Sequence, residues 1–160
     1  MDSVYIETSI VSHAAAWPSP DPGTALLQQQ AREWWDTERS KFRVVTSQLV
    51  LDEAALGDPK AAAERLRMLA GIDLIPTDAR VELVADELIS RHLMPEKARL
   101  DAFHVATAAV GGVQFLLTQN CRHIANGHML RIYETLAELG FPNLLIYTPG
   151  VFLGGGDDDE

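Results

Sequence analysis

Residues 100–118 read LDAFHVATAAVGGVQFLLT, which predicts one helix followed by one buried strand. Apolar residues dominate the first half of the stretch, and we expect a mostly buried helix as far as Val110. The pair Gly111-Gly112 ends that helix, because consecutive glycines disfavour its continuation. Phe115–Thr118 is then a short apolar run, typical of a strand covered on both faces.

The same alternation of helices with short apolar strands extends over the rest of the chain. Further strands are predicted at Val4–Ile6, Phe42–Thr46, Asp73–Ile75 and Leu144–Tyr147. Helices are predicted at about 24–39, 47–56, 60–70, 78–91 and 95–110, with another before Gly140. This order predicts an α/β, three-layer fold with a central, mainly parallel sheet of about five strands flanked by helices.

Composition indicates one globular domain without a membrane segment. The 160 residues are 47% apolar and 22% charged, and no apolar stretch is long enough to cross a bilayer. The start Met1–Ile10 lacks the pattern of a secretion signal, and the single Cys121 forms no internal disulfide. We expect a domain over residues 1–153, a disordered acidic tail over residues 154–160, and a cytoplasmic location.

The charge of the chain is a constraint on its partners. The formal net charge is −10, of which the four acids of Asp157–Glu160 supply −4. An acidic domain binds nucleic acid poorly, because neutralisation of phosphates dominates that affinity. A polynucleotide substrate would therefore require metal ions and a local basic surface.

Polar residues follow several of the predicted strands. Glu7 comes directly after the first strand and Asn120 comes after Phe115–Thr118, whereas Glu53 and Asp101 lie on predicted helices. Ligands of parallel α/β sheets bind outside the carboxyl ends of the strands, where these side chains would converge. Carboxylate and amide oxygens are the ligands that Mg²⁺ and Mn²⁺ prefer. Acidic residues are also common on helix surfaces, so the spacing alone is weak evidence.

Several segments together resemble PIN-domain ribonucleases, and most of all the VapC-type toxins of toxin–antitoxin pairs. The resemblance covers residues 3–153 and depends on Tyr5–Ile10, Leu51–Ala54, Asp101–Ala108, Leu117–Ile124 and Tyr147–Pro149. Asp101–Ala108 is its most specific part.

The resemblance implies a divalent-metal-dependent endoribonuclease, the toxin of a type II pair, that hydrolyses RNA phosphodiester bonds with Mg²⁺ or Mn²⁺. It also implies a cognate antitoxin and a homodimer, with the early helices as the contact surface. Independently of the resemblance, Trp17, Trp34 and Trp35 can mark a partner surface. The adjacent Trp34 and Trp35 are expected not to share one core. The residue roles that it implies are metal binding by Glu7, Glu53 and Asp101, completion of the catalytic set by Asn120, and support or substrate binding by Ser9, Thr118 and Arg122.

Two departures from the family pattern weaken the implied ligand set. Glu7 stands where the family usually has aspartate, and Asn120 removes one negative charge. Three anionic ligands favour one bound ion over two. The alternative is a catalytically weak or inactive PIN-like module that binds protein or RNA. A phosphatase is disfavoured because Glu7-Thr8-Ser9 is not Asp-x-Asp.

Simpler interpretations of individual residues remain open. Asp101 can complement a helix dipole, and Asn120 can cap the following helix. Asp52 is adjacent to Glu53, so the register of that helix decides which acid faces the site. His104 is expected to be a packed or hydrogen-bonded residue, whereas His123 can meet substrate phosphate or lie in solvent.

Overall fold

The computed structural model describes residues 1–153, and it shows an all-parallel sheet surrounded by helices. The strands are β1 Ser3–Ile6, β2 Arg43–Thr46, β3 Asp73–Leu74, β4 Phe115–Leu117 and β5 Leu145–Tyr147. The α-helices are α1 Thr8–Ala14, α2 Pro22–Glu33, α3 Gln48–Ala54, α4 Pro59–Leu69, α5 Ala79–Ser90, α6 Arg99–Val110, α7 Met129–Glu138 and α8 Pro149–Leu153. Short π- and 3₁₀-helical turns are η1 Trp34–Glu38, η2 Arg39–Lys41 and η3 Glu96–Ala98. None of the helices in residues 1–153 is long and apolar enough to cross a membrane.

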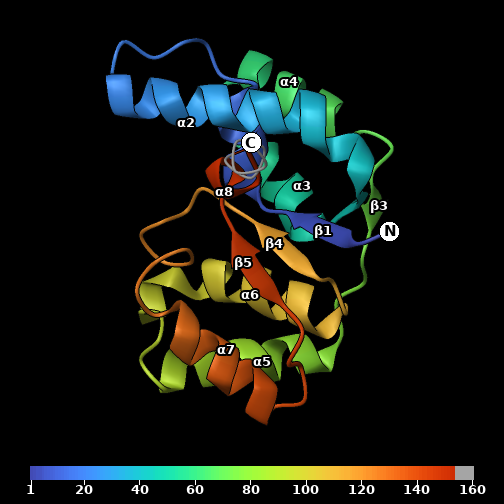
Figure 1. Ribbon diagram of the computed structural model, residues 1–160, viewed down its shortest axis with the longest axis vertical. Coiled ribbons are helices and arrows are strands. Elements are labelled where there is room, and N and C mark those ends of the chain that lie inside the picture. Colours follow the sequence, from blue (N-terminus) through green and yellow to red (C-terminus); the bar gives the residue numbers. More distant parts are fainter. Residues whose placement is uncertain (154–160) are drawn as a thin grey trace, which may run out of the picture.

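The sheet has the strand order β3-β2-β1-β4-β5, and each neighbouring pair is parallel. This confirms the predicted five-strand α/β architecture. β1 lies at the centre, where Val4 is paired with Val44 on one side and Phe115 on the other. Figure 1 shows α5, α6 and α7 on one side of the sheet and α2, α3 and α4 on the other. The carboxyl ends of β1, β2 and β4 therefore meet at one edge.

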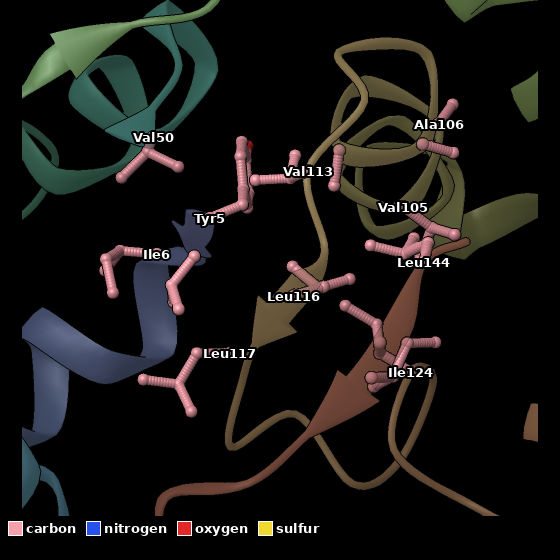
Figure 2. Close-up of a cluster of buried hydrophobic side chains, with 14 of the residues drawn as sticks. Tyr5, Ile6, Val50, Val105, Ala106, Val113, Leu116, Leu117, Ile124 and Leu144 are labelled. Atoms are coloured by element: carbon pink, nitrogen blue, oxygen red, sulfur yellow. The ribbon is translucent and has the colours of Figure 1, made fainter. Parts of the chain in front are cut away.

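The core runs through β1, β4 and α6. Val4, Tyr5 and Ile6 have no exposed surface, because β1 has a strand on each side and a helical layer on each face. Seven of the twelve residues of α6 are buried, which agrees with the apolar character predicted for 100–110. Figure 2 shows side chains of all three elements within this cluster.

Two short helices were not predicted from the sequence. α1 begins directly after Glu7, whose carboxylate accepts a hydrogen bond from the Ser9 amide as an N-cap. Its sequence, TSIVSHA, is rich in β-branched residues, which lower helix propensity, so the cap and burial stabilise it instead. α8 follows the last strand at Pro149. The helix expected before Gly140 is α7, which begins only at Met129.

Trp34 and Trp35 are both buried, so the expectation that they cannot share a core was wrong. The end of α2 continues into the π-helical turn η1, and the two rings lie 6.4 Å apart between centroids within one core cluster. The Trp34 ring is 6.2 Å from Phe42 between ring centroids, whereas Trp35 lies under the Arg39 guanidinium at 4.7 Å. Trp17, by contrast, is 91% exposed. The predicted acidic tail, residues 154–160, lies outside the described residues.

Candidate active site at the carboxyl edge of the sheet

Glu7 is a buried carboxylate held by three donors. It extends β1 by one ladder bond, from its amide to the Leu117 carbonyl at 3.1 Å. Glu7 Oε2 accepts from the Ser9 amide at 3.0 Å, and Oε1 accepts from the Ser9 and Thr118 hydroxyls, each at 2.5 Å. The side chain is only 4% exposed, and these bonds compensate the cost of burying it. Ser9 and Thr118 thus support Glu7.

Glu53 is held against α1 and α6. Ser47 accepts from the Val50 amide at 3.4 Å as the N-cap of α3, which sets the start of the helix that carries Glu53. Glu53 Oε1 accepts from the Thr8 hydroxyl at 2.7 Å and lies 2.5 Å from His104 Nε2. The neighbouring Asp52 is exposed and bonds Gln48 instead, so the structure places Glu53 rather than Asp52 at the site.

The environment keeps Glu53 ionised. Partial burial by itself raises the pKa of Glu53, but the hydrogen bonds from His104 and from the Thr8 hydroxyl outweigh burial and hold the pKa below the usual glutamate value. Since the carboxylate is charged, it can only accept a hydrogen bond. We therefore assign the ring hydrogen of His104 to Nε2, which donates to Glu53.

His104 is fully buried and bonded on both ring nitrogens. Its Nδ1 lies 2.8 Å from the Tyr5 hydroxyl, and that hydroxyl lies 2.7 Å from Ser47 Oγ. Burial is the main reason that the pKa of Tyr5 is raised, so the phenol keeps its proton. Because the ring hydrogen lies on Nε2, Nδ1 is an acceptor and the Tyr5 hydroxyl donates the hydrogen bond to it. A hydrogen-bonded chain therefore runs Ser47–Tyr5–His104–Glu53. His104 is a hydrogen-bonded core residue, as the sequence indicated.

Asp101 lies in the first turn of α6 and pairs with a histidine from the turns after β4. Its Oδ2 is 2.9 Å from His123 Nδ1. The His123 amide donates to Asn120 Oδ1 at 3.1 Å, and the Asn120 amide donates to Thr118 Oγ1 at 2.9 Å. Asn120 therefore caps the turns at residues 121–128 rather than a helix. This second chain of bonds links Glu7 to Asp101 through Thr118, Asn120 and His123.

The structure brings most of the predicted residues to one edge, but not into a formed metal cluster. Glu7, Glu53 and Asp101 share no direct hydrogen bond partner with each other, and within residues 1–153 no group of three or more His, Cys, Asp and Glu side chains is arranged to hold a metal ion. Arg122 is exposed and lines a separate pocket beside His123.

The chemistry of the ligand set nevertheless fits a hard cation. Among the described residues, Glu53 Oε2 and Asp101 Oδ1 accept no hydrogen bond, whereas the second oxygen of each carboxylate is fixed by a histidine. Carboxylates that bind metal ions are commonly oriented in this way, with one oxygen held by a protein donor. The residues that would hold an ion are Glu53 and Asp101, together with Glu7.

Three contributors were not assigned from the sequence. Thr8 and the Tyr5 hydroxyl orient Glu53, directly and through His104, and Ser47 holds the Tyr5 hydroxyl. Tyr5 stands in the middle of β1, where the continuous apolar run identifies a buried side chain but not its partner. Ser47 was predicted as a cap alone. Their common role depends on contacts between residues 42 to 99 positions apart.

The family model for the PIN domain matches residues 4–127. The chain therefore belongs to the PIN domain family, and the matched segment contains all seven site residues predicted from the sequence. PIN domains are a nuclease fold that usually acts on RNA and typically uses divalent metal ions. Searches among curated proteins and among solved structures gave no match.

Proposed function

We propose that this protein is a divalent-metal-dependent endoribonuclease that hydrolyses RNA phosphodiester bonds. The observation that carries the proposal is the position of Glu53 and Asp101. Each acid presents one oxygen without a hydrogen bond from the described residues, at the sheet edge where Glu7 is buried. Carboxylates with free oxygens at the ligand-binding edge of a nuclease fold suit a hard cation better than they suit bare RNA.

Each residue has a distinct part in this proposal. Glu7, Glu53 and Asp101 would hold Mg²⁺ or Mn²⁺, which supplies positive charge against the phosphate oxygens of the substrate. Ser9 and Thr118 fix the Glu7 carboxylate. Asn120 and Arg122 would act on substrate binding. Asn120 fixes the turn that contains Arg122, and Arg122 would contact a phosphate of the RNA.

We propose further that the protein is the toxin of a type II toxin–antitoxin pair, a homodimer that acts in the cytoplasm. The resemblance of Tyr5–Ile10 and Asp101–Ala108 to VapC-type toxins supports this. Trp17 is exposed and lines a cavity of about 770 Å³ whose wall carries both acidic and basic side chains, Asp58, Glu64 and Lys60 among them, which suits a protein partner with an apolar anchor and a polar rim.

Cleavage of a panel of structured RNAs tests the enzyme. Purified protein is incubated with Mg²⁺, Mn²⁺ or EDTA, beside Asp101→Asn and the matched control Asp52→Asn. Both substitutions remove one charge, but Asp52 is exposed and bonded only to Gln48. We expect metal-dependent cleavage that Asp101→Asn abolishes and Asp52→Asn retains. Equal cleavage by both variants would refute the assignment of Asp101.

A PIN-like binding module with little catalysis is the second candidate. Two observations favour it: the described residues contain no formed metal group, and the chain has a net charge of −10. This candidate predicts a folded protein that binds RNA or a partner protein without cleaving RNA in any metal. Efficient cleavage at low enzyme concentration would exclude it.

A further inference from the structure

A second pocket is lined by His123, the residue that bonds Asp101. Its volume is about 330 Å³, and its walls come from the turn after α5 and from the turns after β4. Three of the five histidines of the chain line it, together with Arg122 and the apolar residues Leu93 and Met94. The lining contains no acidic residue, although the chain as a whole is strongly acidic.

The donors in this pocket suit the oxygens of a phosphate group. Arg122 is exposed and makes no ion pair with a carboxylate of residues 1–153, so its guanidinium is available to an anion. The imidazoles of His92 and His128 each carry at least one N–H donor in any protonation state. A guanidinium with neighbouring N–H donors is the usual protein environment of a nucleic-acid phosphate.

The backbone at His92 points to a role for its side chain. His92 is the residue after the C-cap of α5, with φ of 59°, and the Leu93 amide closes the helix end on the Leu88 carbonyl at 3.0 Å. Glycine is the usual residue in that left-handed position. The four other described residues with such φ values are all glycine, so His92 is the exception. Histidine tolerates the left-handed region better than most residues, and a ring placed there, in the wall of the pocket, suits a role in binding.

The pocket and the candidate active site share one residue, His123. His123 forms part of the pocket wall, while Nδ1 of the same ring bonds Asp101 at 2.9 Å and the His123 amide bonds Asn120 at 3.1 Å. A ligand in the pocket therefore lies beside the residues that would act on RNA. We propose that this pocket binds a backbone phosphate of the RNA next to the scissile one, through Arg122, His92 and His128. The proposal rests on the proposed nuclease function.

The test measures binding of a short single-stranded oligoribonucleotide to the full chain in EDTA by fluorescence anisotropy, with a gel to show that the RNA stays intact. We expect Arg122→Gln to weaken binding on the order of tenfold and to reduce the slope of log K against log salt by about one. Arg131→Gln is the charge-matched control, because Arg131 is exposed on α7 outside the pocket. An equal effect of the two variants would overturn the proposal, because net charge alone would then explain it.

The variant His92→Gly distinguishes the contribution of the His92 ring to RNA binding from the effect of its left-handed backbone conformation on stability. Glycine relieves the left-handed conformation, so we expect a higher Tm together with severalfold weaker RNA binding. Unchanged binding in this variant would overturn the role of His92. In NMR spectra with inorganic phosphate and then with the oligonucleotide, the ring signals of His92 and His128 should shift, and those of His13 and His104 should not. A shift of all five histidines alike would contradict a local site.

The experiments distinguish failure of the phosphate-site proposal from failure of the nuclease proposal. RNA binding that depends on Arg122 and His92, without cleavage in any metal, supports the pocket and refutes the enzyme. Metal-dependent cleavage with binding that is indifferent to both substitutions supports the enzyme and refutes the pocket.

Discussion

His104 Nε2 lies 2.5 Å from Glu53 Oε1, and this contact joins α6 to α3 at the carboxyl edge of the sheet. The other nitrogen of the ring bonds Tyr5 of β1 at 2.8 Å. One fully buried side chain therefore fixes the orientation of a candidate ligand relative to the central strand. The Glu53 side chain is therefore oriented by hydrogen bonds to other helices, Thr8 of α1 and His104 of α6, and not by residues of its own helix.

Removal of the His104 ring should destabilise the protein strongly. His104→Leu removes two buried hydrogen bonds, one to the Tyr5 hydroxyl and one to the charged Glu53, which keep only Ser47 and Thr8 as partners. We therefore expect a loss of about 2–4 kcal/mol in the free energy of unfolding. Urea denaturation measures it. His128→Leu is the control, because His128 is exposed and a surface change costs within about 0.5 kcal/mol. A small effect at His104 would contradict the bonded arrangement.

Tyr5→Phe tests the chain of bonds at its other end. The change removes only the hydroxyl that bonds Ser47 and His104, and we expect a loss of about 1–3 kcal/mol because buried partners remain unsatisfied. Tyr147→Phe is the matched control, since the Tyr147 hydroxyl has no hydrogen bond partner among residues 1–153. Thermal unfolding of the two variants should differ clearly in Tm, and equal values would contradict the network.

Thr118→Val should weaken the support of Glu7. The isosteric valine removes a hydroxyl donor to a buried carboxylate, and hydrogen bonds to charged groups contribute about 1.5–3 kcal/mol. Thr135→Val is the control, because Thr135 is equally buried but its hydroxyl makes no hydrogen bond within the described residues. Chemical denaturation compares the two variants. A greater loss at Thr135 would show that Glu7 does not need Thr118.

The stabilising contribution of Glu53 should decline in acid. Its pKa is lower in the folded protein than in the unfolded chain, so the contribution is complete above the unfolded value and is lost as pH falls through the folded one. The stability difference between wild type and Glu53→Gln should therefore be constant near neutral pH and shrink below the usual glutamate pKa. Urea midpoints measured across that range check it. Parallel profiles would show that Glu53 is not stabilised in its charged form.

Divalent cations should stabilise the folded protein if the proposed site binds them. Binding to the folded state alone raises Tm by mass action, and EDTA should reverse the effect. We expect the Tm of wild type to rise with Mn²⁺ or Mg²⁺, and the Tm of Asp101→Asn to rise less. The control is Asp52→Asn, which should respond as wild type does. A rise of the same size in all three proteins would place the bound cation elsewhere.

The resemblance to PIN-domain ribonucleases selects candidate site residues, but it does not describe how the protein holds them. Asp101 and Asn120 were selected by their segments, yet both bond His123, and Asn120 caps turns where a helix was expected to begin. Local sequence also misjudged the aromatic residues. Trp34 and Trp35 are adjacent and both buried, because a π-helical turn and Phe42 give each ring its own place.

The sequence by itself determined the alternation of strands and helices and the edge of the sheet where the acidic residues lie. Apolar periodicity and Gly111-Gly112 are local signals, and the carboxyl ends of parallel strands share one edge by geometry. Only the tertiary structure decided the partners of the carboxylates. Glu53 with His104 and Glu7 with Thr118 are contacts over 51 and 111 positions of the chain, and their formation depends on packing of β1 against β4 and α6. Local sequence preferences do not predict hydrogen bonds between such distant residues, so burial and long-range packing determine which side chain each carboxylate bonds.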